Sequence, residues 1–261
     1  MDVTRMAIEQ FLRFVLTTAR VSGLFLMAPM LSDGGVPRRV KIGLAAIVGL
    51  IVFPVLPPAS ARFDVGGLTL AGFVVVLVAE LAVGLVIGLL TAIVMAGIEM
   101  AGLFVGQQTG VALANVINPL SGSSVSVMGR FYSYFALVVF LTIGGHRLLV
   151  AAILKSFLAV PIGGLRFTSG LAEGVAALSG QMFVIAVTIS APVVLALVLA
   201  TLALGLVART VPQLNILAIG FPLRIGLGWT VAMLSLAAVA VLSRDLFLRM
   251  FEDMGALIEL M

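Results

Sequence analysis

Apolar runs separated by short polar segments dominate the chain and predict long helices. Six such runs cover residues 6–31, 42–56, 68–98, 131–160, 178–207 and 214–242. A helix needs about 20 apolar residues to cross hydrocarbon, so run 42–56 is short and run 68–98 is longer than one crossing requires. Run 131–160 is interrupted at 144–147, which predicts either one broken helix or two half-length helices forming a hairpin. The pattern predicts an all-α integral membrane protein built from helical hairpins.

The last segment of the chain, residues 244–261, has a different pattern. Its apolar residues recur at a spacing of three to four, and charged residues lie between them. This is the pattern of an amphipathic helix. We expect it to lie on a membrane surface or to pack against a partner.

The stretch 106–129 is polar but carries no charge, and Glu99 and Arg130 flank it. At membrane depth such a segment must lie against protein or water, because its backbone groups need hydrogen-bond partners. We interpret it as a loop that lines or closes a polar path, although an ordinary extramembrane loop would have the same pattern. The candidate gate residues are Gln107, Gln108, Asn115, Asn118, Pro119, Ser121, Gly122, Ser123, Ser124, Ser126 and Met128.

Small residues recur every four positions before and into this stretch. Such a stripe lets another helix approach backbone to backbone. We therefore expect the polar stretch to begin as helix and to break at Asn118 and Pro119. The predicted packing residues are Gly84, Gly88, Ala92, Ala96, Gly102, Gly106 and Gly110.

Composition supports a membrane protein, but charge does not orient it. The chain is 62% hydrophobic and 10% charged, whereas soluble domains carry roughly 25% charged residues. If all six runs were spans, the 15 Lys and Arg residues would divide equally between the two sides and the runs themselves. The usual excess of basic residues on the cytoplasmic side is therefore missing. We infer that some apolar helices are buried against partner subunits.

Ionisable residues inside apolar runs need partners, because each costs at least about 2.5 kcal/mol at a helix centre. Glu80 is either a proton or ion site or the partner of Arg13, Arg20 or Arg147. Arg224 either hydrogen-bonds carbonyls freed by Pro222 or marks a subunit contact. The predicted buried charges or subunit contacts are Arg13, Arg20, Glu80, Arg147, Arg209, Pro212, Gln213, Pro222 and Arg224.

Enzymatic chemistry lacks its usual residues here. There is no cysteine and one histidine, His146, so we predict no catalytic site, no metal and no cofactor. No basic patch interleaved with aromatic residues indicates nucleic acid. A small secondary transporter, with a site at broken helices near His146 and Pro192, is the competing class.

Four stretches, residues 28–45, 102–119, 141–157 and 204–228, resemble the FliR family of flagellar biosynthetic proteins. The last stretch has the sequence LGLVARTVPQLNILAIGFPLRIGLG. Length and order fit from end to end, and the wording is closer to the flagellar branch than to the injectisome counterpart. The most specific pattern consists of Arg209, Pro212, Gln213, Leu214, Asn215, Gly220, Phe221 and Pro222.

This resemblance implies a non-enzymatic subunit of the flagellar type III export gate. It implies a hetero-oligomeric pore with FliP and FliQ, with FlhB alongside and FlhA beneath, that passes unfolded flagellar proteins. It further implies a location in the bacterial inner membrane, at the basal body, with contact to lipid and much of the complex on the periplasmic side of the membrane plane.

The resemblance also implies a division of the chain. Residues 1–177 correspond to a FliP-like portion whose loop 106–129 plugs the pore. Residues 178–261 correspond to a FliQ-like hairpin with the amphipathic helix. The chain departs from the family at Asn118, commonly Asp, and at Thr109, commonly Met. The basis for a charged role at the first position and for a methionine seal at the second is therefore missing.

Overall fold

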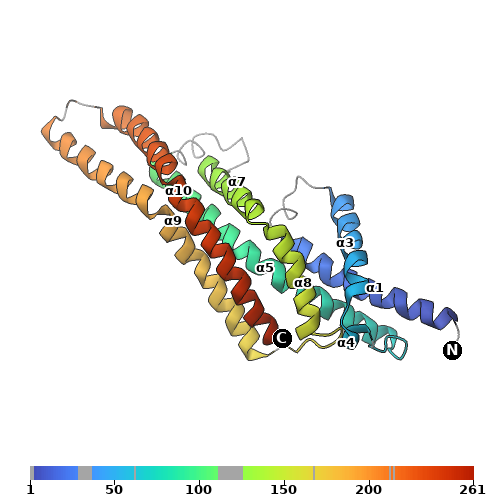
Figure 1. Ribbon diagram of the computed structural model, residues 1–261. Helices are drawn as coiled ribbons and strands as arrows, with labels where there is room; N and C mark the ends of the chain where they lie inside the picture. Colours follow the sequence, from blue (N-terminus) through green and yellow to red (C-terminus); the bar gives the residue numbers. More distant parts are fainter. Residues whose placement is uncertain are drawn as a thin grey trace. The chain divides into compact units, whose positions relative to one another are not determined.

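The computed structural model describes residues 3–28, 37–61, 63–110, 126–166, 168–211, 213 and 215–261. These residues form helices and connections without a strand, so the all-α prediction is confirmed (Figure 1). The helices are α1 (Val3–Met27), α3 (Arg38–Val52), the 3-10 helix η1 (Phe53–Val55), α4 (Pro58–Ala61), α5 (Leu70–Thr109), α7 (Val127–Thr142), α8 (Gly145–Ala159), α9 (Ser169–Thr210) and α10 (Ile216–Glu259).

Three of these helices are long and apolar enough to cross a membrane: α5, α9 and α10. The broken pair α7 and α8 would make a fourth span if it counts as one. With 40, 42 and 44 residues, each long helix extends about 60 Å at roughly 1.5 Å per residue. That is about twice the thickness of the hydrocarbon layer. In the described part of the chain, the apolar runs therefore do not form six ordinary membrane spans.

The interrupted run 131–160 is broken into α7 and α8, as its interruption at 144–147 predicted. Gly144, with φ of 73°, precedes α8 and separates it from α7. Glycine occupies this left-handed conformation without the steric cost of a Cβ atom. The break therefore falls at the glycine pair that interrupts the apolar pattern.

The end of α5 differs from the prediction. We expected the helix to continue to Asn118, but it ends at Thr109. Gly110 adopts φ of 81°, and its N–H donates to the Gln107 carbonyl at 3.2 Å. A left-handed glycine directly after the last helical residue is a common helix terminator, and this glycine ends the helix before the proline does.

The amphipathic prediction for residues 244–261 is correct in pattern but wrong in partner. The segment continues α10 without a break, and its apolar side is buried against this same chain. Leu257 packs against Gly174 of α9, and the Met261 carbonyl accepts a 2.7 Å hydrogen bond from the Arg166 N–H. The apolar face therefore needs neither a membrane surface nor another subunit to cover it.

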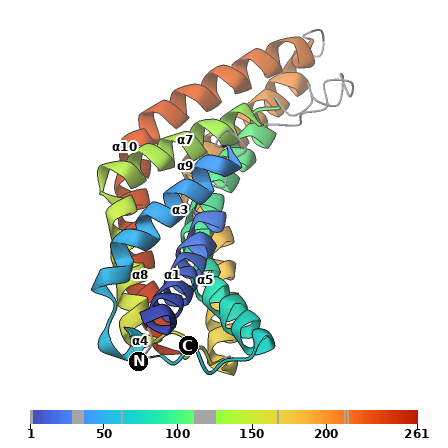
Figure 2. The same ribbon diagram turned by 90° about the vertical axis from the view of Figure 1, so that its right-hand side faces the viewer.

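The helices form two compact units. Unit 1 comprises Met1–Ile93, Gly144–Ser179 and Phe247–Met261, and unit 2 comprises Val94–Ile143 and Gly180–Leu246. The three long helices each contribute a part to both units. Within unit 2, the end of α9 and the start of α10 lie side by side as two arms of a hairpin (Figures 1 and 2). The predicted division into residues 1–177 and 178–261 rests on likeness to other subunits and stays a prediction.

Candidate functional site

The base of the polar segment lies in unit 2, where the end of α5 meets the start of α7. A Cβ atom on Gly102 would lie 2.5 Å from the Met128 carbonyl oxygen. One on Gly106 would lie 2.7 Å from Ser126 Oγ. Only glycine permits so close an approach of two backbones. The two ends of the polar segment are therefore held against each other.

Ser126 and Met128, both predicted gate residues, have structural roles in this base. The Ser126 Oγ accepts a hydrogen bond of 3.1 Å from the Gly129 N–H and caps α7. Met128 is 3% exposed and belongs to the apolar core of unit 2 with Val105, Val193, Leu197 and Ala232. We therefore assign Met128 to this core and not to a pore surface.

Phe221, from the most specific sequence pattern, packs on the end of α5. A Cβ atom on Gly110 would lie 2.8 Å from the Phe221 ring. One residue earlier, Thr109 is buried, and its hydroxyl donates to the Gly106 carbonyl at 2.8 Å. The Thr109 methyl group also faces Gly228 of α10. The stretch that carries the family resemblance thus supports the base of the polar segment.

Gln107 and Gln108 are exposed on the last turn of α5. The remaining gate candidates lie outside the described residues, so their role stays a prediction; they are Asn115, Asn118, Pro119, Ser121, Gly122, Ser123 and Ser124.

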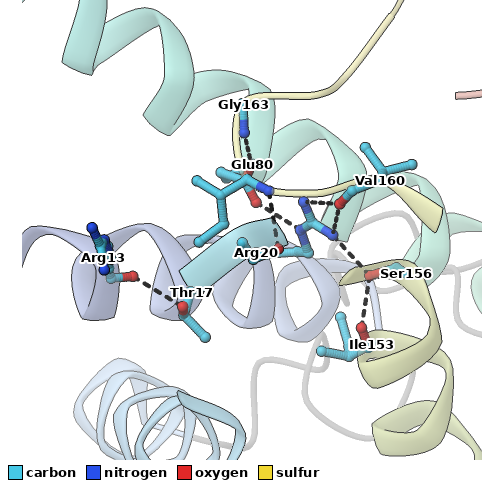
Figure 3. Close-up of polar contacts among 10 residues, drawn as sticks. Arg13, Thr17, Arg20, Glu80, Ile153, Ser156, Val160 and Gly163 are labelled. Atoms are coloured by element: carbon cyan, nitrogen blue, oxygen red, sulfur yellow. Dashed lines mark hydrogen bonds and ion pairs between the residues drawn. The ribbon is translucent and has the colours of Figure 1, made fainter. Parts of the chain in front are cut away.

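A second polar site, fully buried, lies in unit 1 (Figure 3). The side chains of Arg20 and Glu80 are 0% and 1% exposed, and Arg20 Nε lies 2.7 Å from Glu80 Oε2. The Arg20 Nη1 also donates to Ser156 Oγ at 3.1 Å, and both Nη groups donate to the Val160 carbonyl at 3.0 Å. The guanidinium lies over the Phe157 ring, 3.9 Å from its centre, as cations over aromatic rings do.

The second carboxylate oxygen of Glu80 is occupied as well. Its Oε1 accepts a 3.0 Å hydrogen bond from the Gly163 N–H. Of the three arginines considered for Glu80, the structure pairs it with Arg20. Because protein donors engage both oxygens, the arrangement favours a structural ion pair over an ion-binding site. The cluster joins α1, α5, α8 and the turn that follows α8.

The other described residues predicted as buried charges or contacts have different surroundings. Arg13 donates from Nε to the Phe63 carbonyl at 3.1 Å. Arg224 is half-buried, and its Nε is buried without a hydrogen-bond partner among the described residues. Five further candidates remain: Arg147, Arg209, Gln213 and Pro222 are exposed, and Pro212 lies outside the described residues.

The predicted small-residue stripe contacts different elements in the two units. In unit 1, a Cβ atom on Gly84 would collide with the Arg20 carbonyl oxygen, and one on Gly88 would lie 2.7 Å from the Leu24 carbonyl oxygen. In unit 2, Gly102 and Gly106 face the start of α7. Ala92 and Ala96 are half-buried.

Two close approaches were missed by the sequence analysis. Gly23 of α1 faces the Leu81 backbone in unit 1, and Gly97 faces Met182 and Ile185 of α9 in unit 2. Gly23 lies one turn after Arg20 and could have been found as a small residue on the same side of α1. Gly97 is out of register with the four-residue spacing, so the periodic pattern concealed it.

The fold and these sites define an α-helical integral membrane protein whose uncharged polar segment starts from a glycine-packed base. Residues 11–250 match the family described as "Bacterial export proteins, family 1". The chain therefore belongs to this family. Its relatives place it in the FliR group, as the sequence pattern predicted.

Three curated relatives are each named "Flagellar biosynthetic protein FliR". The Bacillus subtilis protein is 34% identical over 261 residues, covering 97% of both chains. The Escherichia coli protein is 31% identical over 240 residues, covering 92% of this chain and 90% of the relative. The Pectobacterium carotovorum protein is 30% identical over 234 residues, covering 89% and 87%.

Proposed function

We propose that the protein is a core subunit of the flagellar type III export gate. It would form, with FliP and FliQ, the channel through which unfolded flagellar proteins cross the bacterial inner membrane, with FlhB and FlhA as neighbours. The family match over residues 11–250 carries this proposal. The relatives named above are flagellar, which supports the flagellar gate over its injectisome counterpart. The proposal assigns no catalytic step, metal or cofactor to this chain.

The long helices support assembly with other subunits. Each extends about 60 Å, so roughly half of each helix lies outside a hydrocarbon layer about 30 Å thick unless it tilts strongly. Its apolar side chains then need another cover. On α9, residues Phe183, Val184, Leu195, Leu199 and Leu206 are each more than half exposed. Apolar surface of this extent marks a contact with lipid or protein.

The proposed architecture divides the chain by likeness to its partners. Residues 1–177 take a FliP-like place in the pore, and residues 178–261 take a FliQ-like place. The hairpin of α9 and α10 supports the second assignment, since each arm exceeds 40 residues. In this arrangement much of the complex lies on the periplasmic side of the membrane plane.

The polar segment acts as a plug in this proposal. Gln107, Gln108 and the side chains of residues 111–125 include no ionised group. Neutral amides and hydroxyls hydrogen-bond one another when the channel is closed, and they accept any passing side chain when it is open. The glycine-packed base keeps the two ends of the segment together, so only the part beyond Gly110 and before Ser126 has to move.

Deletion of residues 121–125, which leaves the Ser126 cap of α7 in place, tests the plug in the complete complex. We expect the variant complex, purified at wild-type stoichiometry, to leak ions when reconstituted in vesicles, whereas the wild-type complex stays tight. An assembled complex that does not leak would overturn the plug. Failure of the wild-type chain to co-purify with FliP and FliQ would overturn the gate-subunit proposal itself.

A further inference from the structure

One side of α5 is exposed in unit 2, and most of its exposed residues are polar. From residue 94 to the end of the helix, the exposed residues are Glu99, Leu103, Gln107 and Gln108, of which Leu103 is 37% exposed. Residues three and four apart share a face of a helix. The opposite side is buried, including Ile98, Ala101 and Val105. This exposed line, residues 99, 103 and 107, is hereafter the α5 polar face, and Gln108 is exposed beside it on the last turn.

Glu99 on this face has no hydrogen bond or ion pair among the described residues, although it belongs to a mostly apolar helix. A charge that faces hydrocarbon at a helix centre costs at least about 2.5 kcal/mol, so ionisable residues in such helices face water or a partner. Most exposed residues of α9 in the same unit are instead apolar, among them Phe183, Val187 and Leu199, although Gln181, Thr188 and Arg209 are exposed as well. The two helices therefore present surfaces suited to different surroundings.

The α5 polar face is continuous with the base of the polar segment. Gln107 and Gln108 lie on the last turn of α5, next to Gly106 and Thr109 of that base. Glu99 precedes Gln107 by two helical turns, about 12 Å along the axis at 1.5 Å per residue. The neutral segment thus adjoins a surface that carries a fixed negative charge.

We propose that the α5 polar face lines the path through the gate and that Glu99 determines its charge selectivity. This inference rests on the proposed function. A carboxylate beside a narrow aqueous path attracts cations and repels anions. The same charge favours basic segments of an unfolded chain as they pass. The neutral plug then closes the path without discriminating between charges, and Glu99 favours cations over anions once the path is open.

Single cysteines test whether the face is aqueous, because the chain has none of its own. Cysteine is placed at Glu99, Leu103 or Gln107 and, as matched buried controls, at Ile98, Ala101 or Val105. A charged methanethiosulfonate reagent is applied to the assembled complex. We expect modification at the first three positions and protection at the controls. Protection of position 99 in an assembled complex would place Glu99 against another subunit and overturn the inference.

The charge role is tested in the complex that lacks residues 121–125, by its reversal potential in a KCl gradient. We expect cation selectivity with Glu99, a reversal potential shifted toward zero in Glu99→Gln, and selectivity retained in Glu99→Asp. Glu173→Gln, at an exposed acid of unit 1, is the matched control and should change nothing.

The two proposals fail differently in this experiment. A leak whose selectivity is the same in Glu99→Gln overturns the role of Glu99 and leaves the plug intact. A complex without any leak overturns the plug, and the cysteine pattern then decides whether the α5 polar face meets water.

Discussion

Glu80 and Glu99 lie on the same helix, α5, but in different units and in opposite surroundings. Glu80 is 1% exposed, and its two oxygens accept from Arg20 and Gly163. Glu99 is exposed and has no partner among the described residues. Unit 1 therefore neutralises its buried acid within the chain, whereas unit 2 presents an acid to its surroundings. Identical side chains on one helix thus have different degrees of exposure and different partners.

The arginines show the same difference. Arg20 in unit 1 has a carboxylate, a hydroxyl and a carbonyl as acceptors. Arg224 in unit 2 leaves its Nε without an acceptor among the described residues. A buried pair that is fully hydrogen-bonded gives a uniquely packed site, but loss of one member leaves an uncompensated charge. Unit 1 should therefore be sensitive to charge removal in the isolated chain, and unit 2 should not.

The largest expected effect is the loss of one member of the buried pair. Glu80→Gln should lower the free energy of unfolding of unit 1 by about 3–5 kcal/mol, because Arg20 keeps its charge without a carboxylate. Glu99→Gln, the matched control on the same helix, should stay within about 0.5 kcal/mol. Denaturant or thermal unfolding in detergent, followed by circular dichroism, measures both. Equal effects of the two variants would remove the distinction between the units.

The double variant Arg20→Met and Glu80→Met sharpens this test. It leaves no unpaired charge, so it should be less destabilised than either single variant. A double variant whose loss equals the sum of the single losses would show that the two side chains do not act as a pair.

A smaller effect is expected where α1 and α5 touch. Gly84→Ala should destabilise unit 1 by about 1–3 kcal/mol, because the new Cβ atom meets the Arg20 carbonyl oxygen and a packed backbone cannot move away freely. Gly43→Ala on α3 is the control, since no atom lies within 4 Å of its Cβ position. That variant should be neutral or stabilising by up to about 1 kcal/mol, as alanine favours a helix. Opposite signs in the same unfolding assay are the expected result.

The smallest effect concerns the cap of α7 in unit 2. Ser126→Ala removes the acceptor for the Gly129 N–H, which should cost about 1 kcal/mol. Ser126→Thr keeps a hydroxyl acceptor and should retain most of the stability. Amide hydrogen exchange of residues 127–130 measures the local effect. Equal exchange in the alanine variant and the wild type would contradict the cap.

The sequence predicted the helices well because apolar runs and their interruptions are local features. The break at Gly144 and the close approach at Gly84 both follow from residue type and spacing. The partner of Glu80 could not be predicted from the sequence, which offered three arginines equally. A contact between residues 20 and 80 depends on tertiary packing. The end of α5 was misjudged because the left-handed conformation of Gly110 outweighed the proline further along.

The candidate site was predictable only in part, for a related reason. Residues 106–129 could be found in the sequence because they are polar and uncharged. Which residues of α5 continue this polar surface depends on their exposure in the folded helix, which the sequence does not show. In the sequence, Glu99 was a flanking charge; in the structure, it shares a helix face with Gln107. Met128 shows the opposite difference: it lies within the polar stretch of the sequence, but it packs in the core of unit 2.

The buried cluster of Arg20 has a consequence for the timing of synthesis. Its acceptors lie 60, 136 and 140 residues further along the chain, at Glu80, Ser156 and Val160. At roughly 5–20 residues per second, the ribosome supplies Glu80 about 3–12 seconds after Arg20 and Val160 about 7–28 seconds after it. We expect α1 to remain in a polar environment during this interval, since an unpaired guanidinium is expensive in hydrocarbon. The position of one arginine thus sets the earliest moment at which the first helix can reach its final place.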